Sequence, residues 1–302
     1  MKQCMNTFRY LFIILIFSCS SKKTDLGDKI TLDCIQTEAN GIVPKDLYRV
    51  GTVLPTNLYS YFTKKIDVCG ITLIAGDEIS DSFMENIAQT ISEIFIINEH
   101  TDTLLQKALL TNLYLYNAVI PLYYQDNWNN ERELSINILV EESSVCDIIM
   151  EDVPNQVMEV IEHVLHHITD IGLHYTFPME WHLSSKSKLY DATQQAISLG
   201  YYNINQYSDI IDSGIRNRVI LQEYAYWIIY TAWDLRENYG PHKSEWSIHS
   251  GDQLLSELPE TYTLFQKTIP SVISCPTEQT LNLFLKLLIR FFKKNKTDAY
   301  IR

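Results

Sequence analysis

The sequence of 302 residues contains no internal repeat and no low-complexity segment. It also lacks a Gly-x-Ser-x-Gly elbow, a phosphate-binding loop and a dinucleotide-binding fingerprint. Its apolar run at residues 10–17 is shorter than the roughly 20 residues that a helix needs to span a bilayer. These absences argue against a serine-elbow hydrolase, against a nucleotide-dependent enzyme that uses such loops, and against a membrane-spanning helix at this point.

Basic residues are scarce as well. Lysine and arginine number 24 against 37 acidic residues, which gives a formal net charge of −13. Two of the bases, Lys2 and Arg9, lie in the N-terminal segment, and without them the charge is near −15. An acidic chain repels nucleic acid and anionic membrane surfaces, so neither is an expected partner. We interpret the basic cluster at residues 286–296 as the solvated end of a last helix.

The N-terminus is typical of an export signal. Basic residues precede the apolar run, and small residues follow it. The segment Ile16-Phe17-Ser18-Cys19 resembles a bacterial lipobox, although phenylalanine is unusual at its position. We therefore expect residues 1–18 to be a lipoprotein signal peptide and Cys19 to carry the lipid that holds the protein at the membrane of a bacterial cell envelope. An ordinary cleaved signal peptide is the alternative.

Beyond the signal, residues 19–45 predict a lipidated cysteine and polar tether, and residues 46–302 suffice for a single domain. Four cysteines remain outside the N-terminal segment. In an exported protein this number permits two disulfides in three possible pairings, and their wide spacing fits no zinc knuckle. We expect these cysteines to be structural disulfides or buried thiols: Cys34, Cys69, Cys146 and Cys275.

The pattern of apolar residues predicts an α/β (α+β) fold, with a small mixed sheet followed by a mainly helical part. Three segments predict strands: residues 68–75, 117–124 and 134–141. Six segments predict helices: residues 80–97, 101–111, 152–172, 186–199, 213–238 and 277–294.

Titratable side chains are concentrated between Glu162 and His167, on one predicted helix. Residues four apart share a helix face, so Glu162 lies over His166 and His163 lies over His167. Such a face can hold a divalent metal ion or relay a proton. We expect any active site to lie here. The alternative is that these histidines are ordinary buried or solvated residues.

The order of elements resembles that of the zincin metallopeptidases. In that family, a helix with the motif His-Glu-x-x-His follows a sheet edge; its histidines bind zinc and its glutamate activates water. In the gluzincin branch, a glutamate on a later helix is the third ligand. Here, the segment Gln222-Glu223-Tyr224-Ala225 is similar to the Glu-x-Phe-Ala element that carries this glutamate. The resemblance covers residues 134–235 without an exact copy of the motif, and it extends to a set of secreted or lipid-anchored proteins with no assigned reaction.

Two registers of the motif are open. In the first, Glu162, His166 and Glu223 are the implied metal ligands, and His163 stands where the general base belongs. In the second, His163 and His167 are the ligand pair and Val164 takes the base position, which implies a pseudoenzyme. We prefer the first register, because it gives a reasonable oxygen and nitrogen ligand set and keeps a titratable residue beside the site.

Other residues are secondary candidates. Glu159 is expected to contact His163, and Asp170 is the better candidate to orient His166 from one turn further on. His174 lies at the wrong spacing for a third histidine ligand of the metzincin type. A phenol near the metal, Tyr230 or Tyr175, could stabilise an oxyanion, although we expect most aromatic residues of the Glu223 helix to be core.

The resemblance thus implies an exported, lipid-anchored, metal-dependent hydrolase of the peptidase type. Zinc is the expected cofactor, and a peptide or protein is the expected substrate. His163 would accept a proton from water. The opposing interpretation is a non-catalytic binding lipoprotein on the same scaffold, since a fold does not fix a function.

Overall fold

The computed structural model describes residue 34 and residues 38–57, 61–125, 129–241 and 244–285. The predicted signal peptide, Cys19, most of the predicted tether and the basic cluster near the C-terminus lie outside the described residues. In the part that is described, no helix is long and apolar enough to cross a membrane.

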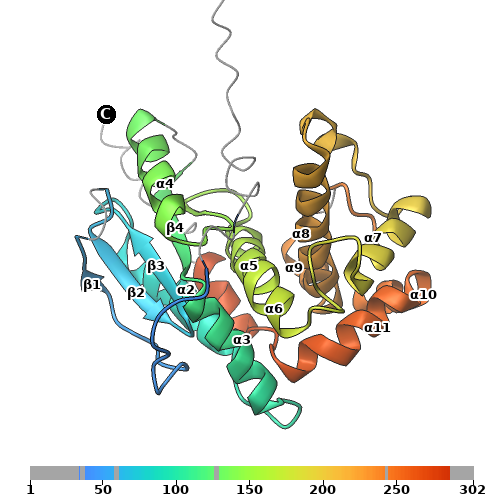
Figure 1. The fold of residues 1–302 in the computed structure, drawn as a ribbon, viewed down its shortest axis with the longest axis horizontal. Coiled ribbons are helices and arrows are strands. Elements are labelled where there is room, and N and C mark those ends of the chain that lie inside the picture. Colours follow the sequence, from blue (N-terminus) through green and yellow to red (C-terminus); the bar gives the residue numbers. More distant parts are fainter. Residues whose placement is uncertain (1–33, 35–37, 58–60, 126–128, 242–243, 286–302) are drawn as a thin grey trace, which may run out of the picture.

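A mixed sheet forms one side of the molecule (Figure 1). Its strands lie in sequence order: β1 (Leu54–Pro55), β2 (Lys64–Val68), β3 (Ile71–Ala75), β4 (Ala118–Tyr124) and β5 (Ile149–Glu151). The first three strands pair antiparallel, and β3, β4 and β5 pair parallel. Together with the mainly helical remainder, this sheet confirms the predicted α/β class.

The strand predicted over residues 68–75 contains a hairpin turn. Cys69 and Gly70 join β2 to β3 with positive φ angles of 49° and 77°. Two left-handed residues in succession are typical of a tight turn between twisted antiparallel strands. A Cβ atom on Gly70 would lie 2.6 Å from the carbonyl oxygen of Leu110, so the turn also needs the space that glycine leaves.

Two predicted helices follow the hairpin and β3. The first, α2 (Asp81–Ile94), begins at Ser80, whose hydroxyl accepts a hydrogen bond from the Phe83 N–H. The second, α3 (Thr103–Leu115), begins at Asp102, whose carboxylate accepts hydrogen bonds from two backbone N–H groups. Both confirm the expected elements, with shifted ends.

The third predicted strand, residues 134–141, is wrong, because this segment belongs to the helix α4 (Asn130–Glu142). The Asn129 side chain caps its first turn by accepting a hydrogen bond from the Arg132 N–H. Its buried residues recur with helical spacing: Arg132, Ser135, Ile136 and Leu139. Of the aliphatic run that suggested a strand, Ile136 and Leu139 are buried, whereas Leu134 and Ile138 are exposed, as expected for one buried face of a helix.

The helix with the histidines lies at the centre of the molecule. It consists of α5 (Gln156–His167), a π-helical turn η1 (Ile168–Leu173) and the short α6 (His174–Thr176). The predicted end near Gly172 is wrong, since the helical chain continues through it. A Cβ atom at Gly172 would lie 2.8 Å from Leu109 Cδ2, so this glycine allows close packing against α3.

The remaining helices form the other side of the molecule (Figure 1). They are α7 (Lys188–Ser198), α8 (Ser213–Ala232), α9 (Leu235–Tyr239), α10 (Gly251–Glu257) and α11 (Pro259–Thr268). The last described helical residues, 278–285, return to α2, where Phe284 packs against Phe83. The helix predicted over residues 213–238 is interrupted at Asp234, which has a φ of 56°. In Figure 1, α5 lies between the sheet and α8, and it contacts both β5 and α8.

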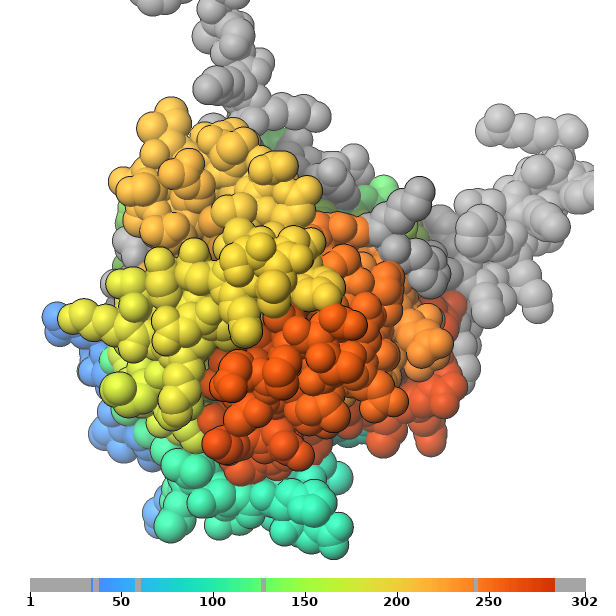
Figure 2. All heavy atoms as spheres, turned by 90° about the vertical axis from the view of Figure 1, so that its right-hand side faces the viewer, coloured from blue at the N-terminus to red at the C-terminus, as the bar shows by residue number. Residues whose placement is uncertain are grey.

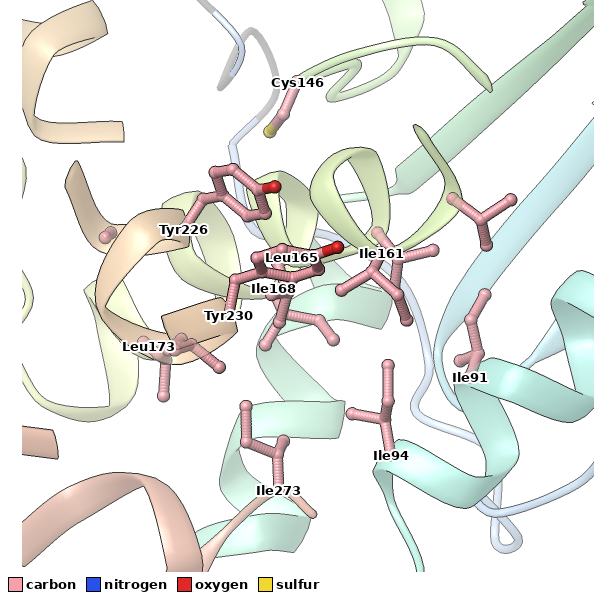
Figure 3. Close-up of a cluster of buried hydrophobic side chains, with 14 of the residues drawn as sticks. Ile91, Ile94, Cys146, Ile161, Leu165, Ile168, Leu173, Tyr226, Tyr230 and Ile273 are labelled. Carbon is pink, nitrogen blue, oxygen red and sulfur yellow. The ribbon is translucent and has the colours of Figure 1, made fainter. Parts of the chain in front are cut away.

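The hydrophobic core joins the two sides across α5. Figure 3 shows Tyr226 and Tyr230 of α8 pointing toward α5, where Ile161 and Leu165 meet them. Both tyrosines are fully buried. The prediction that the aromatic residues of this helix are core is confirmed for these two.

One disulfide is formed by the cysteines that the structure describes. It links Cys34 to Cys146, across 112 positions of sequence. Cys69 is a buried free thiol and Cys275 is an exposed one. The expectation of structural disulfides or buried thiols therefore holds for three of the four cysteines.

Candidate metal centre

Three predicted site residues converge between α5 and α8. Glu162 and His166 share one face of α5, as their spacing predicts, and α8 brings Glu223 to the same place. One ligand atom from each side chain lies within 4.8 Å of the other two. His166 is fully buried, whereas both glutamates are partly exposed, so this set extends from the core toward solvent. We call these three residues the metal cluster.

The two ring nitrogens of His166 have different surroundings. Nδ1 lies 2.9 Å from Asp147 Oδ2, a good hydrogen-bond distance. Nε2 is buried, lies 3.8 Å from Glu223 Oε2 and has no hydrogen-bond partner among the described residues. When the Nδ1 proton is donated to Asp147, the neutral ring presents a lone pair at Nε2. A buried, unpartnered lone pair beside two carboxyl groups fits a metal ion.

Asp147 is the functional residue that sequence reasoning missed. Burial alone would raise the pKa of its carboxyl group, but the charge of His163 and the hydrogen bond with His166 lower it to about 2. Asp147 is therefore ionised at neutral pH. It comes from the segment before β5, and no helical spacing connects a loop residue to a histidine 19 positions later. The sequence thus carried no local signal for this contact.

The two glutamates of the metal cluster favour their protonated forms when no cation is present. Burial raises the pKa of both Glu162 and Glu223 to about 8. Repulsion from nearby carboxylates contributes to these raised pKa values: Glu223 acts on Glu162, and Glu245 and Asp147 act on Glu223. A divalent cation would favour both carboxylates, so its binding would release protons.

His163 lies between two carboxylates. Its Nε2 is 3.7 Å from Asp147 Oδ2, and its Nδ1 is 3.4 Å from Glu159 Oε1, which confirms the predicted contact with Glu159. Burial would lower the pKa of the ring, but Asp147 and Glu159 raise it well above its ordinary value. Without a metal ion, the ring is therefore protonated at neutral pH.

His167 has a structural role. Its Nδ1 lies 2.8 Å from the carbonyl oxygen of His163, and its Nε2 lies 3.0 Å from both the Cys146 nitrogen and the carbonyl oxygen of Val119. Burial lowers the pKa of the ring to about 4, so it is neutral. Because both nitrogens are engaged with the backbone, the ligand pair of the second register, His163 with His167, is not available.

Asp170 does not orient His166. It lies in η1, where it accepts a hydrogen bond from Thr169 Oγ1, and one of its oxygens is 3.6 Å from Cys34 Sγ. Burial raises the pKa of this carboxyl group to about 6. The orienting role expected for Asp170 belongs to Asp147.

Asp170 belongs to a second group of ligand-type atoms, which it forms with Cys34 and Cys146. We call these three residues the cysteine cluster. Their sulfur and oxygen atoms lie as close together as those of the metal cluster. The two sulfurs are bonded to each other, however, so they are not available as thiolate ligands.

The remaining histidine candidate lies outside both clusters. His174 accepts a hydrogen bond from the Leu183 N–H at Nδ1, and its ring lies 4.0 Å from that of His182. Burial, together with the nearby His182 and Arg218, lowers the pKa of His174 to about 3. It is a buried neutral histidine.

The two phenol candidates differ in position. Tyr175 stacks on Tyr116, with ring centroids 4.0 Å apart. Tyr230 points toward α5 together with Tyr226 (Figure 3), and neither hydroxyl has a hydrogen-bond partner in the described part of the chain. Burial and then the charge of Glu162 raise the pKa of both these phenols. Of the two predicted candidates, Tyr230 is therefore the one influenced by the metal cluster.

A surface groove lies away from the metal cluster. A groove of about 780 Å³ runs between α7 and α11, on the face that Figure 2 shows. It is lined by both acidic and basic side chains, among them Glu180, Lys188 and Glu260. None of the metal-cluster residues lines it, so the groove has no part in the chemistry of that cluster.

The donor atoms of the metal cluster are one imidazole nitrogen and the oxygens of two carboxyl groups. This set suits first-row divalent metals and is harder than a set with two histidines. No family model, curated protein or solved structure matches the chain. The geometry defines a group that could hold a metal ion, with Asp147 and His163 beside it.

Proposed function

We propose that the protein is a metal-dependent hydrolase of the peptidase type, with zinc held by Glu162, His166 and Glu223. The observation that carries this proposal is the Nε2 atom of His166, which is buried, has no hydrogen-bond partner among the described residues and lies beside two carboxyl groups. An unpartnered buried nitrogen costs about 1–3 kcal/mol. A metal ion would satisfy it and would neutralise the two carboxylates.

When bound, zinc would polarise a substrate carbonyl group and lower the pKa of water. The protein's own residues would do the rest. Asp147 would hold the Nδ1 proton of His166, which keeps Nε2 free for ligation. The partial exposure of Glu162 and Glu223 gives a substrate access from the solvent side.

His163 is the proposed proton carrier. In its neutral form it would accept a proton, as the sequence predicts, and in its protonated form it would donate one to the leaving group. Its carboxylate neighbours, Asp147 and Glu159, favour the protonated form in the metal-free protein. The role of acceptor stays a prediction, and the dependence of the hydrolysis rate on pH in His163→Gln would test it.

The cellular setting is also a proposal. A lipid on Cys19 would anchor the domain in the bacterial cell envelope, where peptides and proteins are the proposed substrates. The excess of acidic residues supports this choice over nucleic acid. We also propose the zincin-like arrangement, with a ligand helix and a later glutamate helix, and this proposal rests on the sequence resemblance described above.

The experiment that tests the proposal measures bound metal. The protein from residue 20 onward is purified without added metal or chelator, and its metal content is compared with that of Glu162→Ala, His166→Ala and the control His182→Ala. We expect near-stoichiometric zinc, or another first-row metal, in the wild type and the control, and its loss in the two ligand variants. A wild-type protein that neither contains metal nor takes up added zinc would contradict the proposal.

A non-catalytic binding lipoprotein is the second candidate. The enclosure of His163 by two carboxylates favours it, because this position would hold a free base in an active zincin. A metal-loaded protein that hydrolyses no member of a broad peptide library, and whose metal content still depends on Glu162 and His166, would favour this candidate.

A further inference from the structure

The two residues Cys146 and Asp147 connect the helices that carry the metal cluster. The Cys146 N–H donates to His167 on α5, and its carbonyl oxygen accepts from Gln222 Nε2 on α8 at 3.3 Å. Asp147 binds His166. Each contact therefore reaches a metal-cluster residue or the residue next to one. We call Cys146 and Asp147 the bridging segment.

The disulfide holds this bridging segment from the other side. Cys34 is buried, and its sulfur lies 3.6 Å from Asp170 of η1 and 3.6 Å from Arg218 Nη2 of α8. Cys34 thus lies near α8 and near η1, the continuation of α5, whereas Cys146 contacts α8 and α5 itself. Figure 3 shows the Cys146 side chain above α5, near Tyr226 of α8. The covalent bond therefore locks the bridging segment in place between the two ligand-bearing helices.

We propose that the Cys34–Cys146 disulfide and Asp147 act together as a positioning unit that sets the metal affinity of Glu162, His166 and Glu223. This inference rests on the proposed metal centre. With the bond intact, Asp147 fixes the ring of His166 so that Nε2 points at the two carboxyl groups. With the bond open, the bridging segment gains freedom, and the oriented histidine is lost. The site is then a strong metal site in an oxidising compartment and a weak one in a reducing compartment.

The opening step is a thiol–disulfide exchange with a dithiol. A dithiol thiolate attacks one sulfur, the Cys34–Cys146 bond breaks, and a mixed disulfide forms. The second thiol of the reductant then attacks the mixed disulfide, and the reductant is released as a cyclic disulfide. Two electrons and two protons pass to the protein, which ends with two free thiols.

The first test is a cobalt(II) titration of residues 20–302, with a chelator of known affinity as competitor. It compares the wild type with Cys34→Ser/Cys146→Ser and with Cys275→Ser, a matched control that removes a free thiol. Outer partners of metal ligands contribute about 10- to 100-fold to affinity, so we expect a loss of at least about 10-fold in the double variant and none in the control. Circular dichroism of each variant checks the fold.

A second arm needs no substitution. The wild type is reduced with a phosphine, which takes oxygen from water and becomes the phosphine oxide, and the reagent is removed without air before titration. A thiol assay counts the cysteines that have been released. We expect the metal cluster to lose cobalt affinity as in the double variant, and this arm decides the question if that variant does not fold. Because reduction also frees the Cys34 and Cys146 thiols beside Asp170, a thiolate-to-cobalt band in the near ultraviolet identifies any ion that these thiols hold instead.

The third test separates positioning from general loosening. Asp147→Ala is expected to weaken cobalt binding by about 10- to 100-fold in the disulfide-bonded protein and by much less in the disulfide-free protein. The effects should not add, because loss of the disulfide and loss of Asp147 both act through the orientation of His166. Asp147→Asn, which keeps an acceptor oxygen for the His166 N–H, is expected to restore part of the affinity and of the cobalt visible spectrum. Equal effects of Asp147→Ala in both backgrounds would overturn the inference.

The outcomes also distinguish this inference from the proposed function. If the oxidised wild type binds no cobalt or zinc, the metal centre itself is refuted. If it binds metal, and the reduced protein and the double variant bind it with the same affinity and spectrum, the metal centre stands and the positioning unit is refuted.

Discussion

The metal cluster and the cysteine cluster both include residues of the helix that continues from α5 into η1, and in each cluster one ligand-type atom from every residue lies within 4.8 Å of the others. The two clusters nevertheless differ in their chemistry. In the metal cluster, the ligand-type atoms are separate, and the Nε2 atom of His166 has no hydrogen-bond partner among the described residues. In the cysteine cluster, the sulfurs satisfy each other through a covalent bond. Proximity of ligand-type atoms is therefore insufficient evidence for a metal site. The deciding property is whether a lone pair remains without a partner.

The largest effect is expected from a substitution that removes a ligand of the metal cluster. His166→Ala removes the only nitrogen donor of the metal cluster and is expected to lower zinc affinity by more than the roughly 100-fold that loss of an outer partner costs. The affinity is measured by competition with a chelator. His182→Ala, which changes a histidine outside both clusters, is the control. A His166→Ala protein with wild-type affinity would show that the metal, if bound, lies elsewhere.

A smaller effect is expected at His167, the residue that follows His166. His167→Ala leaves the buried Cys146 N–H without its acceptor, which costs about 1–3 kcal/mol of unfolding free energy. Because His167 is not a ligand, this variant should still take up stoichiometric zinc when zinc is in excess. Urea unfolding and metal analysis of the same preparation measure both properties. Complete loss of zinc from folded His167→Ala would revive the second register of the motif.

A pH effect sharpens the contrast between ligand and structural histidines. The pKa of His174 is about 3 in the folded protein, against 6.5 for an ordinary histidine. Between these values, the unfolded chain binds a proton that the folded protein does not, so stability falls as the pH falls from 6.5 toward 3. The slope from this residue is at most about 1.4 kcal/mol per pH unit.

The measurement for His174 is urea unfolding at several pH values. His174→Asn offers an oxygen in place of the ring nitrogen that accepts from Leu183, and it cannot titrate. The difference in stability between the wild type and this variant should therefore change across the window. A constant difference would show that His174 titrates alike in both states.

The smallest effect is expected at the exposed thiol. Cys275→Ser should change the free energy of unfolding by no more than about 0.5 kcal/mol, because the residue is exposed and forms no disulfide. Cys34→Ser, by contrast, opens the cysteine cluster and is expected to cost about 2–4 kcal/mol. Thermal or urea unfolding of the two variants side by side measures the difference. Equal costs would contradict the assignment of the disulfide.

Helical spacing explains how much of the site could be predicted. Glu162 and His166 lie four apart, and this local rule placed them on one face. Glu223 was found only through the resemblance of its segment, since no spacing rule connects two helices. Asp147 and the Cys34–Cys146 disulfide could not be predicted, because both depend on how a loop is folded back onto α5 and α8.

The fold shows the same division between local and non-local causes. Most helices were predicted from their apolar pattern and caps. Residues 134–141 were misread because a short aliphatic run fits a strand and a helix equally well, and the deciding cap, Asn129, was overlooked. The strand at 68–75 was misread because the turn at Cys69 and Gly70 depends on positive φ angles and on room beside Leu110.

The π-helical turn η1 has a consequence for how related sequences should be aligned. A π-turn fits one more residue into a helical turn than an α-helix does, so it acts as a one-residue insertion in the phase of the helix. Residues before Ile168 follow the α-helical repeat that places Glu162 and His166 on one face. Residues after Ile168 are rotated relative to that face. A search pattern with fixed α-helical spacing across this point will therefore assign Asp170 and His174 to the wrong face. Patterns for such sites should be written in two parts, which join at the π-turn.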